Sequence, residues 1–356
     1  MPLRKPAYPY IPNATPEVRK AMLREIGVAK AMDLFDHIPP HLKYLQDLHL
    51  PEPIQDELTL KQHLNSLLNQ NLHTEDCASF LGGGCAKHYV PAVCDEINSR
   101  AEFVTAYAAE FYADHGKWQA LFEFGSLMAE LLNMDVVNGL LYDAAQAMAT
   151  SIRMASRMTG RNEVIVSENI SPDIKMILTN YMRGVGTDQI RIHWANWDPR
   201  TGETDAQHVQ NMITDNTAAI CIQNPNYLGV LESKAPDLGQ LAKSRGTEFI
   251  VATDPICLGV LAPPADYGAT IACGDYHSLG LHLLAGGGLG GFIATPGEMR
   301  YMAEFKDKMY GIAPTQTPGE YGFANILFFR TSFGSREKAK EYSGTSNALW
   351  ALTAGV

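Results

Sequence analysis

Short apolar segments alternate with helix-like segments in the middle of the chain, and this alternation limits the possible folds more than any other feature. The apolar segments are residues 163–167, 190–194, 218–223 and 249–253, and helical patterns lie near 171–183, from 205 and near 236–245. The apolar segments are continuous, which is typical of strands that are covered on both faces of a parallel sheet. Their spacing of roughly 25–30 residues fits successive βαβ units. The sequence therefore predicts an α/β fold, a mostly parallel sheet with helices on both faces.

Composition and charge exclude several classes of protein. The 356 residues can form one large α/β domain or two smaller ones. A net charge of −11 argues against nucleic acid or an anionic membrane as partner, because both require clustered Lys and Arg. No apolar stretch approaches the roughly 18 residues of a membrane span, and residues 1–6 lack the apolar region of a signal peptide. We therefore expect a cytoplasmic protein.

The six cysteines do not indicate a metal site. Three of them lie in apolar, strand-like segments and are expected to be reduced core residues. The other three, Cys77, Cys85 and Cys94, are separated by eight and nine positions, which matches no zinc-binding pattern.

Residues 1–75 are predicted to form a helical arm, and the sheet domain is predicted to occupy residues 76–356. Thr15 is a helix N-cap followed by Pro16 in the first turn, and Gly27 is the stop. A second short helix is expected at roughly 28–37, before the next prolines. Because such an arm cannot bury its own core, we expect it to lie on another surface, of this subunit or of a neighbour.

An acid at the end of a strand, followed by a loop with histidines and glycines, forms a candidate cofactor site. The strand 249–253 runs into Asp254, and the stretch 274–292 contains His277 and His282. In pyridoxal phosphate enzymes such an acid pairs with the pyridine nitrogen, and a lysine after the histidine binds the cofactor covalently. Here the residue after His282 is Leu283, which has no amine. The pattern predicts a pyridoxal phosphate fold without its own cofactor lysine, and so a subunit that needs a partner.

The glycine run 286–291 formally contains the pattern G-x-G-x-x-G. A strand-like segment follows it, whereas a dinucleotide site requires a helix there. We interpret Gly286, Gly287 and Gly288 as a loop that borders the partner's cofactor, and the alternative is a loop of purely structural use, where the missing Cβ permits close approach.

Motifs in collinear order over nearly the whole chain show a family resemblance. They include Tyr10-Ile-Pro-Asn13, His88-Tyr-Val-Pro-Ala-Val93, Arg100-Ala-Glu-Phe-Val-Thr-Ala-Tyr107, Asn224-Pro-Asn226 and Ser278-Leu-Gly280. On these residues the chain resembles the N-terminal half of glycine decarboxylase, the P-protein of the glycine cleavage system, which in many bacteria is a separate subunit 1. No single motif is diagnostic, but the ensemble is specific.

The resemblance implies a fold-type-I pyridoxal-phosphate-dependent transferase architecture with the N-terminal arm, and with the family's C-terminal small domain absent or truncated beyond Val356. It implies that a homologous, lysine-bearing subunit 2 binds pyridoxal phosphate covalently and that this chain completes the site. The assembled enzyme would decarboxylate glycine or a related amino acid, and a lipoyl carrier protein would take the aminomethyl product. Two alternatives remain open: a non-catalytic scaffold subunit, or a subunit of an enzyme for a different amine. Polar side chains along the cofactor would favour catalysis, and apolar ones would favour the scaffold.

Departures from the family pattern gather near the expected site. They affect residues 108–116, 144–146 and 276–288. Because buried polar groups that lose their partners penalise binding, these departures predict a divergent member for which glycine is not the best substrate.

The candidate catalytic residues are Tyr107, His115, His277 and His282. Beside Asp114, His115 could form an acid–base pair, and Tyr107 could bind a substrate carboxylate. Each could equally be a packing or surface residue. Tyr142 and Asp143 are expected to line the partner's cofactor site together with the glycine loop. For Asp254 we expect a structural role, with its side chain bonded to the amides of its own turn.

Overall fold

The computed structural model of the protein describes residues 11, 13–44, 46, 48–73, 76–78, 87–103, 115–183, 189–284, 289–326, 341 and 346–356. The chain divides into two compact units, residues 1–73 and residues 74–356. Among the described residues, no helix combines the length and the apolar composition needed to cross a bilayer.

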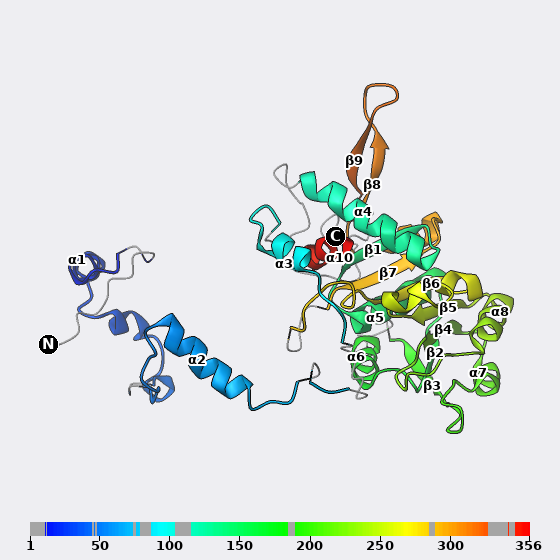
Figure 1. Ribbon diagram of the computed structural model, residues 1–356, viewed down its shortest axis with the longest axis horizontal. Coiled ribbons are helices and arrows are strands. Elements are labelled where there is room, and N and C mark those ends of the chain that lie inside the picture. The colour runs from blue at the N-terminus through cyan, green and yellow to red at the C-terminus, as the bar shows by residue number, and fades with distance from the viewer. Residues whose placement is uncertain are drawn as a thin grey trace. The chain divides into compact units, whose positions relative to one another are not determined.

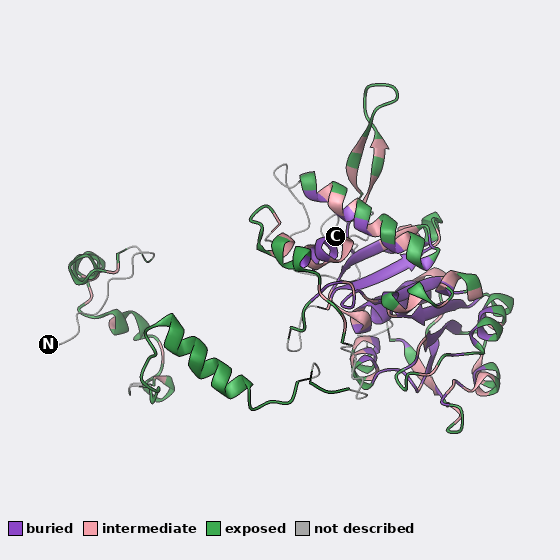
Figure 2. Cartoon of the chain, in the orientation of Figure 1, coloured by how far each residue is buried: buried purple, intermediate pink, exposed green. Residues whose placement is uncertain are grey.

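The first unit consists of short helices that bury none of their described side chains. Its elements are α1 (Pro16–Ile26), the 3₁₀ helices η1 (Ala31–Phe35) and η2 (Pro40–Leu42), and α2 (Glu57–Leu68). As predicted, α1 follows the N-cap Thr15 and ends at Gly27, whose φ of 85° suits glycine. The second predicted helix is a short 3₁₀ helix instead of an α-helix. Figure 2 shows α2 exposed along its whole length and α1 exposed except at Leu23, so the described residues of this unit form no buried core.

The second unit is built on a seven-stranded sheet. Its strands are β1 (Val136–Leu141), β2 (Glu163–Ser167), β3 (Arg191–Ala195), β4 (Thr217–Gln223), β5 (Glu248–Ala252), β6 (Ile271–Asp275) and β7 (Gly291–Thr295). The spatial order is β1-β7-β6-β5-β4-β2-β3. β7 runs antiparallel to both of its neighbours, and the remaining pairs are parallel. The prediction of a mostly parallel sheet is confirmed.

Helices cover both faces of this sheet. They are α3 (Ala92–Ser99), α4 (His115–Leu132), α5 (Ala144–Thr159), α6 (Pro172–Met182), α7 (Ala206–Met212), α8 (Ala235–Arg245), α9 (Met299–Met302) and α10 (Ala348–Gly355), with the 3₁₀ helices η5 (Pro255–Gly259) and η6 (Pro264–Tyr267). α5 and α6 pack on one face, and α4, α8 and α10 pack on the other. A two-stranded hairpin, β8 (Met309–Pro314) and β9 (Tyr321–Ile326), projects from the second unit beside α4 (Figure 1).

Two separate apolar cores explain why the strands are apolar at successive positions. In β5, Phe249 and Val251 belong to the core under α4 and α8, while Ile250 and Ala252 belong to the core under α5. Successive side chains of a strand point to opposite faces, so a strand between two cores must be apolar at every position. Burial of each large side chain stabilises the fold by roughly 1.5–3 kcal/mol. The packing of helices on both faces of the sheet fixes the positions of the strand ends, and so of the loops that follow them.

Candidate functional site

Acidic residues collect at the carboxyl-terminal edge of the sheet. Asp143 follows β1, Asp254 lies just beyond β5, and Asp275 is the last residue of β6. Parallel strands end at the same edge of a sheet, and open α/β sheets bind ligands there. The topology therefore makes one candidate site from residues that are up to 132 positions apart in sequence (275 − 143).

Asp254 bonds to its own turn and also to the loop after β6. Its Oδ1 accepts the backbone N–H of Ile256 at 3.1 Å and the hydroxyl of Ser278 at 2.5 Å. The first bond caps η5, and it is the interaction with turn amides that we expected. The second bond is a link that the sequence did not predict, and it joins two loops of the candidate site.

Asp275 carries the most strongly perturbed carboxyl group of this edge. Burial raises the pKa of Asp275 to about 7, and the negative charges of Asp254 and Asp143 add to the increase. The backbone N–H of His277 donates to Oδ1 of Asp275 at 3.2 Å and opposes the shift. A carboxyl group with such a pKa can hold or release a proton near neutral pH.

Tyr142 and Asp143 form the turn between β1 and α5. Oδ1 of Asp143 accepts the N–H of Gln146 at 2.7 Å, and Oε1 of Gln146 accepts the N–H of Tyr142 at 2.8 Å. This reciprocal pair is a capping arrangement that satisfies two amides at the start of the helix. The carbonyl of Tyr142 also accepts the N–H of Gly290 at 2.8 Å. The structure thus brings both predicted residues next to the start of β7, at the same edge as Asp275.

His277 is buried and lies against a second histidine. Only 2% of His277 is exposed, and its ring meets the His88 ring edge to face, with centroids 4.6 Å apart. Nε2 of His277 lies 3.3 Å from the carbonyl of His282, and Nε2 of His88 lies 2.6 Å from the carbonyl of Leu281. Because a carbonyl oxygen only accepts, both Nε2 atoms must carry hydrogen, which leaves Nδ1 as the basic nitrogen of a neutral ring.

The electrostatic surroundings favour the neutral form of His277. Burial lowers the pKa of His277, and the neighbouring His88 lowers it further, while Asp254 acts in the opposite direction. A neutral imidazole in a fixed tautomer can accept a proton, which is the chemistry expected of a general base.

His282 differs from His277 because it lies on the surface. Its Nε2 lies 2.8 Å from Oδ1 of Asp95 in α3. The next residue, Leu283, is 61% exposed. The segment from 277 to 283 therefore leads from the buried edge of the sheet out to solvent.

The remaining predicted residues cannot be placed. Tyr107, Gly286, Gly287 and Gly288 lie outside the described residues. His115 is the first residue of α4, but its side chain is also outside the described part. Among the described residues, no group of three or more His, Cys, Asp or Glu side chains is arranged to hold a metal ion.

Sequence reasoning missed His88, Asp95, Ser278 and Asp275 as candidate site residues. His88 and Asp95 meet the loop after β6 across 193 and 187 positions, so their pairing could not be inferred from local patterns. One available signal was the motif around His88. Another was the acid that ends the apolar segment 271–275, in the same way that Asp254 follows β5.

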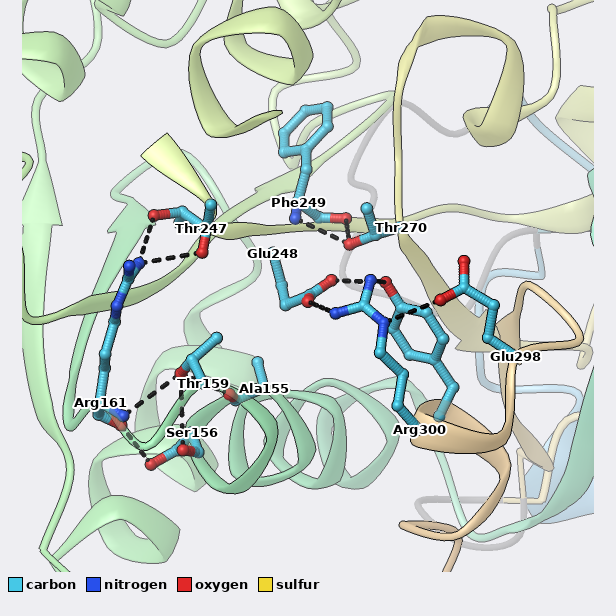
Figure 3. A network of polar contacts seen from close by, with 12 residues as sticks. Ala155, Ser156, Thr159, Arg161, Thr247, Glu248, Phe249, Thr270, Glu298 and Arg300 are labelled. Atoms are coloured by element: carbon cyan, nitrogen blue, oxygen red, sulfur yellow. Dashed lines mark hydrogen bonds and ion pairs between the residues drawn. The ribbon is translucent and has the colours of Figure 1, made fainter. Parts of the chain in front are cut away.

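The opposite edge of the sheet has a polar network of its own, shown in Figure 3. Glu248 begins β5 and accepts Nη1 of Arg300 at 2.9 Å and the hydroxyl of Tyr301 at 2.8 Å. Nearby, Nη1 of Arg161 donates to the carbonyl of Gly246 at 3.0 Å and to the hydroxyl of Thr247 at 3.3 Å. A cavity of about 420 Å³ adjoins this network. These polar groups satisfy one another, so we interpret this edge as structural.

Comparison with solved structures places this seven-stranded α/β unit in the fold class of fold-type-I pyridoxal-phosphate-dependent enzymes. A crystal structure of glycine decarboxylase (P-protein) of the glycine cleavage system, in inhibitor-bound form, matches with a TM-score of 0.80 and 34% identity. That match covers 98% of this chain and 76% of the other. A sphingosine-1-phosphate lyase from Burkholderia pseudomallei matches with a TM-score of 0.55 and 17% identity, over 89% of this chain and 72% of its own, which supports the fold alone.

Sequence comparison places the chain more narrowly. The glycine cleavage system P-protein family matches residues 9–356. A probable glycine dehydrogenase (decarboxylating) subunit 1 from Staphylothermus marinus is 34% identical, over 98% of this chain and 75% of the relative. A protein of the same name from Saccharolobus islandicus is 35% identical, over 98% and 76%. The chain belongs to the glycine cleavage system P-protein family, which confirms the resemblance inferred from its motifs.

Proposed function

We propose that this chain is subunit 1 of a pyridoxal-phosphate-dependent glycine decarboxylase and completes the active site of a lysine-bearing partner subunit. The relatives that it matches over nearly its whole length are named as subunit 1 of such an enzyme. The name implies a second subunit, and pyridoxal phosphate is the cofactor expected of the family.

One observation supports the proposal most directly. The carboxyl edge of the sheet has an acid where a pyridoxal phosphate site would have one, but it lacks the lysine that would bind the cofactor. Asp254 lies beyond the end of β5, where an acid for a pyridine nitrogen would stand, but it is engaged by Ser278. The sequence contains no lysine from residue 244 to residue 305, and the residue after His282 is the exposed Leu283. These residues can line one side of the cofactor site, but none of them can bind the cofactor covalently.

When bound, the cofactor supplies an electron sink that lets carboxylate leave as CO2. His277 would accept or hold a proton at Nδ1, since its Nε2 hydrogen is directed at a carbonyl. Asp275 would hold or release a proton near neutral pH, because burial raises its pKa to about 7. Tyr142, Asp143 and the glycine loop 286–288 would border the cofactor, and Tyr107, His115 and His282 remain candidate catalytic residues.

The polar character of this edge favours a catalytic role over a scaffold. Buried or partly buried His277, Asp275, Asp254 and Ser278 line it. These groups pair with one another, so it is Asp275 that favours catalysis, because its pKa of about 7 suits proton transfer near neutral pH and has no use in a scaffold. A glutamine variant of His277 separates the two roles. It should lower glycine–bicarbonate exchange without affecting assembly, whereas a scaffold would tolerate it.

Glycine is the substrate that the family supports, and a different amino acid is the alternative. One of the departures that suggested another substrate has a structural explanation, since Gln146 caps α5. The departure at 108–116 lies outside the described residues, so the preference for another amine stays a prediction. Exchange rates with glycine, alanine and serine, measured with a lipoyl carrier protein present, decide between them.

Covalent labelling tests which of the two subunits carries the lysine that binds the cofactor. The complex with the lysine-bearing subunit would be reduced with borohydride and digested, and the pyridoxyl peptide would be mapped by mass spectrometry. We expect the label on a lysine of the partner only. A stoichiometric pyridoxyl-lysine in this chain would overturn the proposal. The matched control is the chain without its partner, which should remain unlabelled.

A further inference from the structure

The loop after β6 is held by a separate segment of the chain, residues 88–95, at several points. The two imidazole contacts are the ring pair of His88 and His277 and the bond from His88 to the carbonyl of Leu281. Both contacts fall within one turn of the loop, since the N–H of Leu281 donates to the carbonyl of His277 at 3.2 Å. One side chain, His88, therefore touches both ends of the turn.

Two further contacts hold the outer part of the loop. Asp95 accepts from His282, and Gly280 lies against Cys94 of α3. Gly280 has a φ of 86°, and a Cβ there would approach Sγ of Cys94 to 2.7 Å. This position therefore requires glycine for its backbone conformation and for its close approach to α3.

The segment that holds the loop is itself tied to the body of the unit. The hydroxyl of Thr353 in α10 donates to Oδ1 of Asn98 in α3 at 2.6 Å. α10 in turn packs with α4 in the core. α3 can therefore act as a fixed support for the loop.

We propose that His88 and Asp95 are positioning residues, which hold the turn from His277 to His282 in one arrangement at the edge where the partner's cofactor is bordered. This inference rests on the proposed function. It goes beyond that function because it gives His88 and Asp95 a positioning role, which does not require contact with the cofactor or the substrate. His88 would fix the orientation of the buried imidazole, and Asp95 would fix the exposed end of the turn.

Several charged groups surround this arrangement and make it sensitive to pH. Asp254 and Asp275 act on His277 from the ends of β5 and β6, and His88 acts on it from the segment before α3. Asp95 faces His282. Burial and the neighbouring His88 ring, 4.6 Å away, both oppose protonation of His277, so the contact should loosen when acid protonates His277.

Hydrogen exchange of the full chain, followed by mass spectrometry, tests the holding role without reference to activity. His88→Leu removes the donor to Leu281, and His88→Gln keeps an N–H donor of similar reach. We expect faster exchange in peptides covering 276–284 for His88→Leu and near wild-type exchange for His88→Gln. On α3, Asp95→Asn should increase exchange at the end of the turn near His282. The matched control is Glu96→Gln, which makes the same change of charge at the next residue and should leave exchange unchanged. Equal exchange in all four variants would overturn the inference.

Kinetics of the assembled enzyme test the catalytic consequence. A misplaced group can cost roughly 10- to 100-fold in rate, so His88→Leu should lower kcat for glycine–bicarbonate exchange by about that factor. KM should change little and His88→Gln should recover most of the rate. In wild type the rate should fall on the acid side, and this acid limb should move to higher pH in His88→Gln, because His88 lowers the pKa of His277 and the variant loses that contribution. An unchanged kcat in a loosened His88→Leu complex would refute the positioning role. If wild type itself shows no exchange, the proposed function fails instead, and hydrogen exchange alone decides whether the loop is held.

Discussion

Ser278 donates a hydrogen bond of 2.5 Å to Oδ1 of Asp254, which joins the loop after β6 to the loop after β5. The two residues are 24 positions apart in sequence and follow two neighbouring parallel strands, whose carboxyl ends meet at this edge. A bond to an ionised acceptor is shorter and stronger than a neutral one. This pair therefore couples the acid that resembles a cofactor partner to the loop that carries His277.

Removal of the Ser278 hydroxyl tests this coupling. We expect Ser278→Ala to destabilise the chain by about 1–2 kcal/mol, because a partly buried carboxylate loses a charge-assisted bond. Chemical denaturation followed by circular dichroism would measure the loss. Ser126→Ala is the matched control, since its hydroxyl bonds to a helix carbonyl at an exposed site. An equal loss of unfolding free energy in the two variants would show that the bond to Asp254 stabilises the chain no more than an exposed helix bond does.

Asp275 should make the stability of the chain fall as pH rises. Its pKa is raised from 3.8 to about 7 in the folded state, so the folded state binds this proton more tightly. The resulting stabilisation is complete below about pH 4 and is lost as pH rises through about 7. Asp275→Asn should thus be more stable than wild type at pH 8, by up to about 4 kcal/mol for three pKa units, and similar at pH 4.

Thermal unfolding of the chain at pH 4, 6 and 8 would check the Asp275 prediction. Asp215→Asn, at an exposed turn, is the control and should behave like wild type at each pH. A pH-independent difference between Asp275→Asn and wild type would contradict the shifted titration.

Gly274 should resist replacement because β6 packs closely at this point. A Cβ on Gly274 would overlap the carbonyl oxygen of Thr253 and crowd the Phe292 ring. We expect Gly274→Ala to cost about 1–3 kcal/mol through overpacking. Gly259, which has open space around it, supplies the control, and its alanine variant should stay within about 0.5 kcal/mol of wild type. Denaturant midpoints compare the two, and a harmless Gly274→Ala would mean that the strand can shift.

The network of Glu248 and Arg300 in Figure 3 should act on stability and not on catalysis, because it lies at the opposite edge of the sheet. The Glu248 side chain is 5% exposed, so Arg300→Met leaves a buried carboxylate with the hydroxyl of Tyr301 alone. We expect a loss of about 1–3 kcal/mol, moderated because Arg300 is half-exposed. Adding Glu248→Gln should recover part of it, since a neutral amide needs less compensation. Additive losses in the double variant, or reduced exchange activity at full stability, would argue against this assignment.

Much of the fold was readable from the sequence because it follows local rules. The strand 163–167 was predicted with the bounds of β2, and α6 and α8 begin within one residue of the predicted helices. Other elements were missed, and β1 and α5 show why. β1 is short and contains Asn138 and Gly139, and α5 is rich in alanine, threonine and serine, which blurs its apolar face. Both are stabilised by tertiary packing, as most of α5 is buried against the sheet.

The sequence by itself determined the parallel sheet between two helical layers, the family, and the absence of a lysine after His282. These follow from apolar periodicity and residue identity, which are properties of local stretches. Only the tertiary structure decided that Asp143, Asp254 and Asp275 share one edge, and that His88 and Asp95 contact the loop of His277. Such pairings span from tens to nearly two hundred positions, because the edge of a sheet assembles loops according to strand order in space and not according to their order in the chain.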